Sequence, residues 1–395
     1  MYELKNADFT AAFGREPTHL FSAPGRTELS GNHTDHQHGC VLAAAVNLET
    51  LAWVALNGTD TIRVLSEGYP QCNISLQDLE KKAEEENTTA ALIRGVAAKF
   101  TAMGCGLSGF DAYVTSTVLP GSGLSSSAAF EVLMGVIINC LFYGGKATPV
   151  EVAQIGQWAE NVYFGKPSGL MDQTASSVGN IITIDFADPA SPIVRRIDFD
   201  FTAAGYALCI IDSGADHADL TDEYAAITRE LKTLCRAFGK EYLRDVDEAE
   251  FYARLKDARK AAGDRAVLRA MHFFAENKRV CRQVAALEQG DFDAFLQDVK
   301  ESGRSSWMLL QNVIPAGRKE HQEMAVALAA AEKLLAGRGA CRVHGGGFAG
   351  TMQAFVPLDM LDSFRTGIEA VLGEGACHVL SIRPEGGILV KEARA

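Results

Sequence analysis

The sequence lacks a long apolar run, paired cysteines and a leader-like N-terminus. No stretch approaches the roughly 18 consecutive apolar residues that a transmembrane helix requires. The nine cysteines are scattered and include no CxxC pair, which is typical of reduced thiols in a cytosolic protein. The first residues carry acidic side chains and lack the apolar core of a secretory signal. We therefore expect a soluble, cytoplasmic protein.

Positive charge is also scarce. The chain carries 37 Lys and Arg against 50 Asp and Glu, a net charge of −13, and it has no basic block interleaved with aromatic residues. Such a chain repels the phosphates of nucleic acids and anionic lipids. We therefore expect neither nucleic acid nor a membrane as a partner. Small molecules are the expected partners, and a monomer is slightly favoured.

The 395 residues are enough for two lobes, and strand-like and helix-like stretches alternate in the first half. Residue patterns predict strands at 41–56, 61–65, 110–118, 180–186 and 207–214, and helices at 79–100, 126–141 and 149–165. Residues 220–332 are mainly helical, and strands return near 352–357 and 378–384. The predicted fold is α+β, with two interlocked lobes at 1–195 and 196–395.

A glycine-serine string, LPGSGLSSSAA at 119–129, connects a predicted strand to a predicted helix. Gly121 and Gly123 allow the backbone to approach an anion, and the first turn of the helix favours phosphate. The serine hydroxyls can donate to phosphate or bind Mg²⁺. A plain serine N-cap explains any single residue, but not the whole string. The string therefore predicts a phosphate site.

The common nucleotide-binding motifs are absent. No GxxxxGK(S/T) occurs, and no GxGxxG opens a βαβ unit that carries an acidic residue about 20 positions further on. The predicted phosphate site is therefore not of either usual type.

Residues 23–39 concentrate polar side chains: Arg26, Glu28, Asp35 and three histidines within seventeen positions. One interpretation is a Zn²⁺ site formed by His33, Asp35, His36 and His38. A second is a site that hydrogen-bonds the hydroxyls of a sugar. A solvated polar loop is the third, and the residues alone do not decide among the three.

Together these motifs resemble the GHMP small-molecule kinases, and among them the galactokinases. Residues 25–39 resemble the signature GRxxxxGEHTDYxxG, residues 119–129 resemble PxGxGLSSSAA, and residues 345–350 resemble the third glycine motif. Further agreement lies at 159–173, 217–235 and 271–280. The matches follow the family's order along nearly the whole chain.

The resemblance implies a role for each matching residue. It makes Asp172 the catalytic carboxylate and Arg26 the cation paired with it, and it places Mg²⁺ on Ser127 and Glu160. The residues that it assigns to the sugar are Asn32, His33, Thr34, Asp35 and Tyr224. The residues that it places around the phosphates of ATP are Gly121, Ser122, Gly123, Leu124, Ser125, Ser126 and Ser127.

Four departures from the family pattern concern the sugar rather than phosphoryl transfer. Asn32 replaces a glutamate, His36 a tyrosine and His38 an aspartate, and GFAG replaces GFGG. The expected activity is ATP-dependent phosphorylation of a sugar, with galactose as first choice and galactose 1-phosphate and ADP as products. Three alternatives remain: a kinase for galacturonate or arabinose, a non-catalytic sugar sensor, and a zinc hydrolase.

Overall fold

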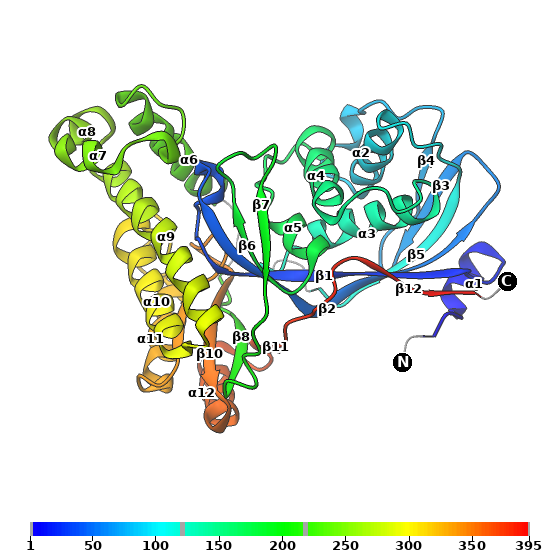
Figure 1. Ribbon diagram of the computed structural model, residues 1–395. Helices are drawn as coiled ribbons and strands as arrows, with labels where there is room; N and C mark the ends of the chain where they lie inside the picture. Colours follow the sequence, from blue (N-terminus) through cyan, green and yellow to red (C-terminus); the bar gives the residue numbers. More distant parts are fainter. Residues whose placement is uncertain (1–2, 119–122, 216–219, 394–395) are drawn as a thin grey trace.

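The computed structural model describes residues 3–118, 123–215 and 220–393. Two β-sheets form its framework, and each carries helices (Figure 1). The predicted glycine-serine string lies partly outside this description, because residues 119–122 are not included. The architecture is α+β, as the sequence predicts.

The larger sheet has eight strands in the order β12-β1-β2-β5-β3-β4, with β6 paired to β2 and β7 paired to β6. The long strand β2 is its centre, because it pairs antiparallel with β1, β5 and β6 along different parts of its length. The strands are β1 (His19–Ser30), β2 (Cys40–Leu56), β3 (Thr61–Ser66), β4 (Cys72–Ser75), β5 (Phe110–Ser116), β6 (Ile181–Asp185), β7 (Ile193–Ile197) and β12 (Ile388–Glu392).

Helices cover one face of this sheet, and α1 (Ala7–Phe13) lies at its far end (Figure 1). The covering helices are α2 (Thr89–Ala102), α3 (Ser126–Leu141), α4 (Pro149–Ala159) and α5 (Met171–Val178). A capping box between Thr148 and Glu151 begins α4. The same helix continues as a π-helical turn, Glu160–Phe164, a feature that is frequent at functional sites.

The smaller sheet has the order β11-β8-β10-β9, formed by β8 (Tyr206–Asp212), β9 (Ala340–Val343), β10 (Thr351–Pro357) and β11 (Cys377–Leu380). Alternate residues of β8 enter two different cores, so this sheet is buried on both faces. Helices α11 (Glu323–Leu335) and α12 (Leu361–Leu372) pack on one face. Helix α10 (Phe292–Ser305) packs on the other, in a core that also contains Leu29 of β1 and Leu42 of β2. This shared core holds the two sheets together.

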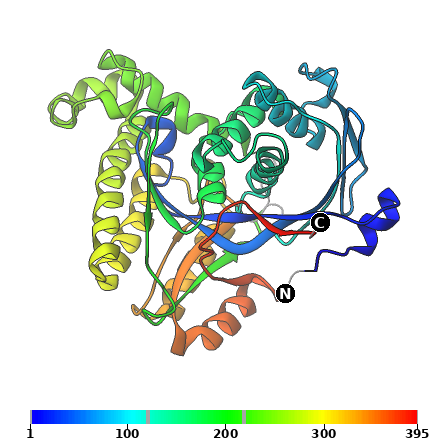
Figure 2. The ribbon, with the colours of Figure 1, turned by 45° about the vertical axis from the view of Figure 1, so that its right-hand side comes forward.

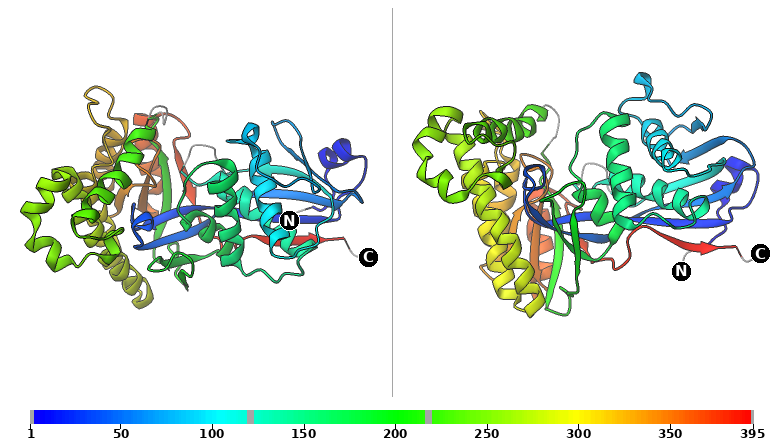
Figure 3. Two further views of the ribbon diagram at one scale, coloured as in Figure 1. Left: turned by 90° about the horizontal axis from the view of Figure 1, so that it is seen from above. Right: turned by 45° about the horizontal axis from the view of Figure 1, so that its top comes forward.

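The remaining long helices gather at one end of the molecule (Figures 2 and 3). They are α6 (Thr221–Ala237), α7 (Glu248–Ala253), α8 (Leu255–Ala262) and α9 (Asp264–Gln289). The turn between β1 and β2 reaches this group and contains the short 3-10 helix Asp35–Gln37. Other short turns are Ala83–Glu85, Leu243–Asp245, Ser306–Leu310 and Leu358–Met360. Within the described residues, no helix is long and apolar enough to span a membrane.

Most predicted elements are present, and three details differ. The helix predicted from residue 79 begins at Thr89, because the acidic run before it ends at Asn87 with a positive φ of 62°. Residues 19–30 form strand β1, which the pattern did not predict and which includes the first part of the polar cluster, 23–30. A division at residue 195 leaves β12 on the sheet of the first lobe, where it pairs with β1.

Candidate active site

An ion pair between Arg26 and Asp172 joins strand β1 to helix α5. Arg26 donates from Nε to Asp172 Oδ1 at 2.7 Å and from Nη2 to Oδ2 at 2.6 Å. The hydroxyl of Ser125 also donates to Asp172, and the third nitrogen of Arg26 donates to the carbonyl oxygen of Gly123. The bidentate pair therefore fixes the carboxylate beside the glycine-serine string.

The surroundings of this pair keep Asp172 ionised. Burial raises the pKa of Asp172, but the charge of Arg26 and the hydrogen bonds from Arg26 and Ser125 outweigh it and hold this pKa below its ordinary value. Burial lowers the pKa of Arg26, and the Asp172 charge reverses this, so the guanidinium stays charged. Asp172 is thus a carboxylate that can accept a proton or orient a hydroxyl at neutral pH.

The described part of the glycine-serine string turns sharply into α3. Gly123 has a φ of 71°, and a Cβ there would lie 2.9 Å from Thr351 Oγ1, so only glycine fits well. Ser125 occupies the N-cap of α3 in a left-handed conformation, but its hydroxyl makes no cap bond and contacts Asp172 instead. A plain serine cap therefore does not explain this residue. The predicted phosphate ligands Gly121 and Ser122 lie outside the described residues.

Ser127 and Glu160 converge, as a shared metal site requires. Ser127 Oγ in the first turn of α3 lies 3.3 Å from Glu160 Oε1. Lys166 Nζ donates to the same carboxylate oxygen at 3.2 Å, while Gln173 Nε2 donates to Oε2 at 3.0 Å. A hydroxyl and a carboxylate are the oxygen ligands that Mg²⁺ prefers. Lys166 is 60% exposed, so its side chain is free to leave when a cation arrives.

A second buried carboxylate, Glu131, lies behind this pair. Gln173 Nε2 donates to Glu131 Oε2 at 2.9 Å as well as to Glu160, so the amide bridges both acids. Burial and the Glu160 charge raise the pKa of Glu131 well above its ordinary value. Glu131 therefore takes up a proton more readily than an exposed glutamate.

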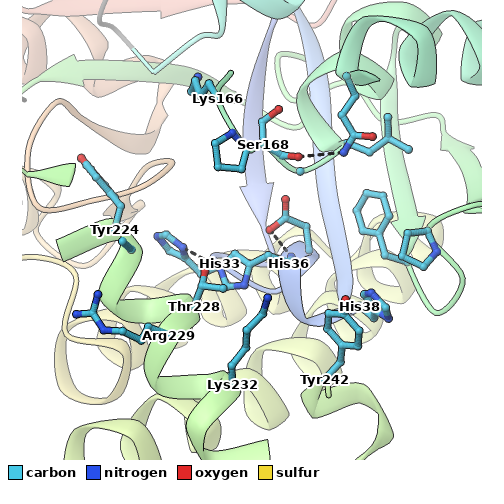
Figure 4. Close-up of a pocket in the computed structure, with 18 of the residues that line it drawn as sticks. His33, His36, His38, Lys166, Ser168, Tyr224, Thr228, Arg229, Lys232 and Tyr242 are labelled. Carbon is cyan, nitrogen blue, oxygen red and sulfur yellow. Dashed lines mark hydrogen bonds between the residues drawn. The ribbon is translucent and has the colours of Figure 1, made fainter. Parts of the chain in front are cut away.

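A cavity of about 1400 Å³ lies between the turn at 33–38, the segment 165–170 and helix α6 (Figure 4). His33, Asp35 and Tyr224, three of the predicted sugar residues, line it. Asp35 Oδ1 accepts the backbone N–H of His36 at 2.8 Å, and burial raises the pKa of Asp35. Asp172 follows two residues beyond the lining segment, and its charge raises the Asp35 pKa further.

Two of the predicted sugar residues, Asn32 and Thr34, are fully buried. Asn32 is fully buried and does not line the cavity. Its Nδ2 donates to Glu28 Oε1 at 3.0 Å and to the Gly345 carbonyl at 2.5 Å. Thr34 is also fully buried, and its hydroxyl donates to the carbonyl oxygens of Gly31 and Cys40. The polar atoms of both side chains are hydrogen-bonded within the protein, and direct sugar contact by these two residues stays a prediction.

The histidines of the cluster do not converge on one point. His33 Nδ1 lies 3.3 Å from His36 Nε2, and His33 Nε2 donates to the Gly346 carbonyl at 2.9 Å. His38 stacks on Tyr242 with ring centroids 3.6 Å apart. Burial and the charges of His33 and Lys232 lower the pKa of His36 to about 3. Within the described ranges, no three His, Cys, Asp or Glu side chains are grouped to hold a metal.

Sequence reasoning missed several residues of this site. Lys166 and Ser168 both contact Glu160, and their position within the matching stretch at 159–173 was the available signal. Three basic residues of α6 line the cavity: Arg229, Lys232 and Arg236. The first two lie within the matching stretch at 217–235, but the sequence gave them no role beyond a charged helix face. Their role depends on what that face meets in three dimensions.

Comparison with known proteins agrees with this geometry. Residues 7–56 match the model of the galactokinase galactose-binding signature, and residues 91–180 match that of the GHMP kinase N-terminal domain. The galactokinase of Streptomyces coelicolor is 31% identical over 387 residues, which is 96% of each chain. The chain belongs to the galactokinase family. This membership accounts for the order of the motifs along the sequence.

Solved structures confirm the fold of this galactokinase family member. Lactococcus lactis galactokinase, solved with galactose, superposes with a TM-score of 0.82 at 24% identity and covers 96% of this chain and 97% of its own. The mevalonate kinase of Methanococcus jannaschii superposes with a TM-score of 0.64 at 12% identity, covering 93% and 99%. At these identities the likeness establishes a GHMP-kinase fold.

Proposed function

We propose that the protein transfers the γ-phosphoryl group of ATP to the anomeric hydroxyl of galactose, releasing galactose 1-phosphate and ADP. The observation that carries this proposal is the Arg26–Asp172 pair, which lies between the string that begins α3 and the cavity lined by Asp35. The family of the chain and the galactose in the Lactococcus lactis structure support the choice of sugar.

Asp172 and Arg26 have complementary roles in this reaction. Asp172 accepts or orients the proton of the attacking hydroxyl, and Arg26 holds the carboxylate in place and stabilises charge that develops during transfer. Phosphoryl transfer depends mainly on positioning and on charge neutralisation, so a carboxylate with a low pKa is sufficient.

The nucleotide and its cation belong to the α3 side of the site. Residues 123–127 are proposed to surround the phosphates of ATP, and Ser127 and Glu160 are proposed to hold Mg²⁺. The cation supplies charge neutralisation on the phosphate oxygens. Lys166, which pairs with Glu160 in the absence of ligand, is placed to contact the phosphates when the cation replaces it.

A panel of acceptors tests the proposal. ADP release is measured with ATP, Mg²⁺ and galactose, galacturonate or arabinose, and the Asp172→Asn variant serves as the blank. The proposal expects galactose-dependent ADP release that the variant loses. Sugar binding without ADP release would instead favour a sensor, and stoichiometric zinc in the purified protein would favour a hydrolase.

A further inference from the structure

Helix α6 gives the acceptor cavity a basic wall. Arg229, Lys232 and Arg236 lie three and four positions apart, so they share one helix face, and all three line the cavity. Lys166 lines it from the opposite side. Asp35 is the one carboxylate among the described lining residues. This local excess of positive charge contrasts with the net charge of −13 for the whole chain.

The three cations on this wall form no ion pair with a described carboxylate, although Glu241 shares a smaller neighbouring hollow with Lys232 and Arg236. Arg229, Lys232 and Arg236 form no ion pair within the described residues, although Glu230 on the same helix binds Arg265 and Arg269. The side chain of Lys232 extends from α6 toward His36, across the floor of the cavity (Figure 4). Its charge reaches His36, because it contributes to the lowered pKa of that imidazole.

The phosphates of ATP do not account for this wall. The described residues of the glycine-serine string, 123–127, do not line the cavity, and Asp172 and Arg26 lie between that string and Asp35. The basic wall thus belongs to the acceptor side of the catalytic pair. A basic side chain that faces the sugar cavity and has no ion-pair partner favours a sugar with an anionic substituent.

We propose that the acceptor site takes a galactose-type sugar that carries an anionic substituent, a carboxylate or a phosphate, and that Lys232 pairs with that substituent. The inference rests on the proposed phosphoryl transfer and specifies its acceptor class. Arg229 and Arg236 flank Lys232 and add to the local potential, while Asp35 keeps its role toward neutral hydroxyls.

The test compares kcat/KM for galactose, galacturonate and galactose 6-phosphate in the wild type and in Lys232→Met, which removes the charge and keeps the apolar stem. Lys240→Met is the matched control for the loss of one positive charge at this end of α6, because Lys240 is exposed and does not line the cavity, although it shares a smaller hollow with Lys232 and Arg236. We expect one anionic sugar to react with a kcat/KM no lower than that of galactose. We expect Lys232→Met to lower the ratio of kcat/KM for the anionic sugar to kcat/KM for galactose about 10-fold or more. We expect Lys240→Met to leave this ratio unchanged.

Added KCl gives a second readout, since a paired charge is weakened by salt and a neutral hydroxyl contact is not. Turnover of galacturonate supports a carboxylate acceptor, and turnover of galactose 6-phosphate supports a phosphate. The inference is overturned if neither anionic sugar reacts or competes with galactose. It is also overturned if Lys232→Met lowers kcat/KM by the same factor for galactose and for the anionic sugars. Reaction of an anionic sugar without reaction of galactose would overturn galactose as acceptor and support the anionic site.

Discussion

Asn32 donates its amide to the carbonyl oxygen of Gly345 at 2.5 Å, across 313 positions of the sequence. The next two carbonyls are held in the same way: Gly346 accepts from His33 and Gly347 accepts from the Tyr224 hydroxyl at 2.9 Å. Three successive carbonyl oxygens of the third glycine motif thus accept hydrogen bonds from Asn32, His33 and Tyr224, and the Gly346 carbonyl accepts a second one from Asn312 Nδ2 at 3.2 Å. The backbone of the third glycine motif therefore holds the side chains of Asn32, His33 and Tyr224 in place.

The first prediction concerns stability at Asn32. Asn32→Asp replaces a donor with a carboxylate that faces the Gly345 carbonyl and Glu28, so two buried bonds are lost. We expect the free energy of unfolding to fall by about 1–3 kcal/mol or more, measured by urea denaturation. Asn6→Asp is the control, because this N-cap only accepts, from Phe9 N–H, and a carboxylate also accepts. Equal stability of the two variants would contradict the assigned role of Asn32.

The second prediction concerns Asp172. Asp172→Asn keeps the shape of the side chain but removes the charge that pairs with Arg26. We expect kcat to fall roughly 100-fold or more, while calorimetry detects unchanged nucleotide affinity. Turnover close to that of the wild type would remove Asp172 from the mechanism.

The third prediction concerns the cation. The double variant Ser127→Ala, Glu160→Gln weakens both proposed oxygen ligands, so half-maximal activity should require about 10-fold or more additional Mg²⁺. Titration of Mg²⁺ at saturating ATP measures this shift. Glu84→Gln, on an exposed turn, is the control. An unchanged titration in the double variant would show that these residues do not hold the cation.

The fourth prediction concerns acid stability. Burial lowers the pKa of His272 to about 4, so between pH 6.5 and 4 the unfolded chain binds a proton there that the folded chain does not. Stability therefore falls as pH drops through this range. Burial raises the pKa of Glu276, but the charges of His272 and Arg279 lower it to about 2, which adds a further loss between pH 4.5 and 2.

His272→Gln isolates the first of these two losses. The variant should lose less stability between pH 6.5 and 4 than the wild type, by about 1 kcal/mol or more, measured by urea denaturation at several pH values. His321→Gln is the control, because that imidazole is 71% exposed. Parallel pH profiles for His272→Gln and the wild type would contradict the buried neutral imidazole.

The helices and strands that the sequence predicts well are those in which the spacing of apolar residues matches the buried positions. Strand β2 and helix α3 have the expected bounds within one residue, because their apolar residues recur at spacings typical of a strand and a buried helix. Strand β1 escaped prediction because Pro24, Gly25 and several polar side chains interrupt any such pattern, although the strand is buried almost throughout. Tertiary pairing with β2 and β12 outweighs local propensity there.

Some residues of the candidate site could be predicted from the sequence and others could not. Arg26 and Asp172 lie 146 positions apart, and family motifs rather than local chemistry identified them as partners. Asn32 matched a motif position, yet its amide turns away from the cavity because three backbone or side-chain partners are available behind it. Lys232 lies within the matching stretch at 217–235 but was given no role, since a lysine on an amphipathic helix is usually solvated. Only the folded arrangement places it opposite His36.

The pairing of β12 with β1 has a consequence for the order of events on the ribosome. His19 at the start of β1 lies opposite Glu392, and Ser22 lies opposite Ile388. The edge of β1 stays open until residues 388–392 emerge, after the other described strands and helices have been synthesised. The strand that carries Arg26 is therefore flanked on both sides only once translation of this segment is finished. A nascent chain cannot complete the pairing of β1 on both edges before that moment.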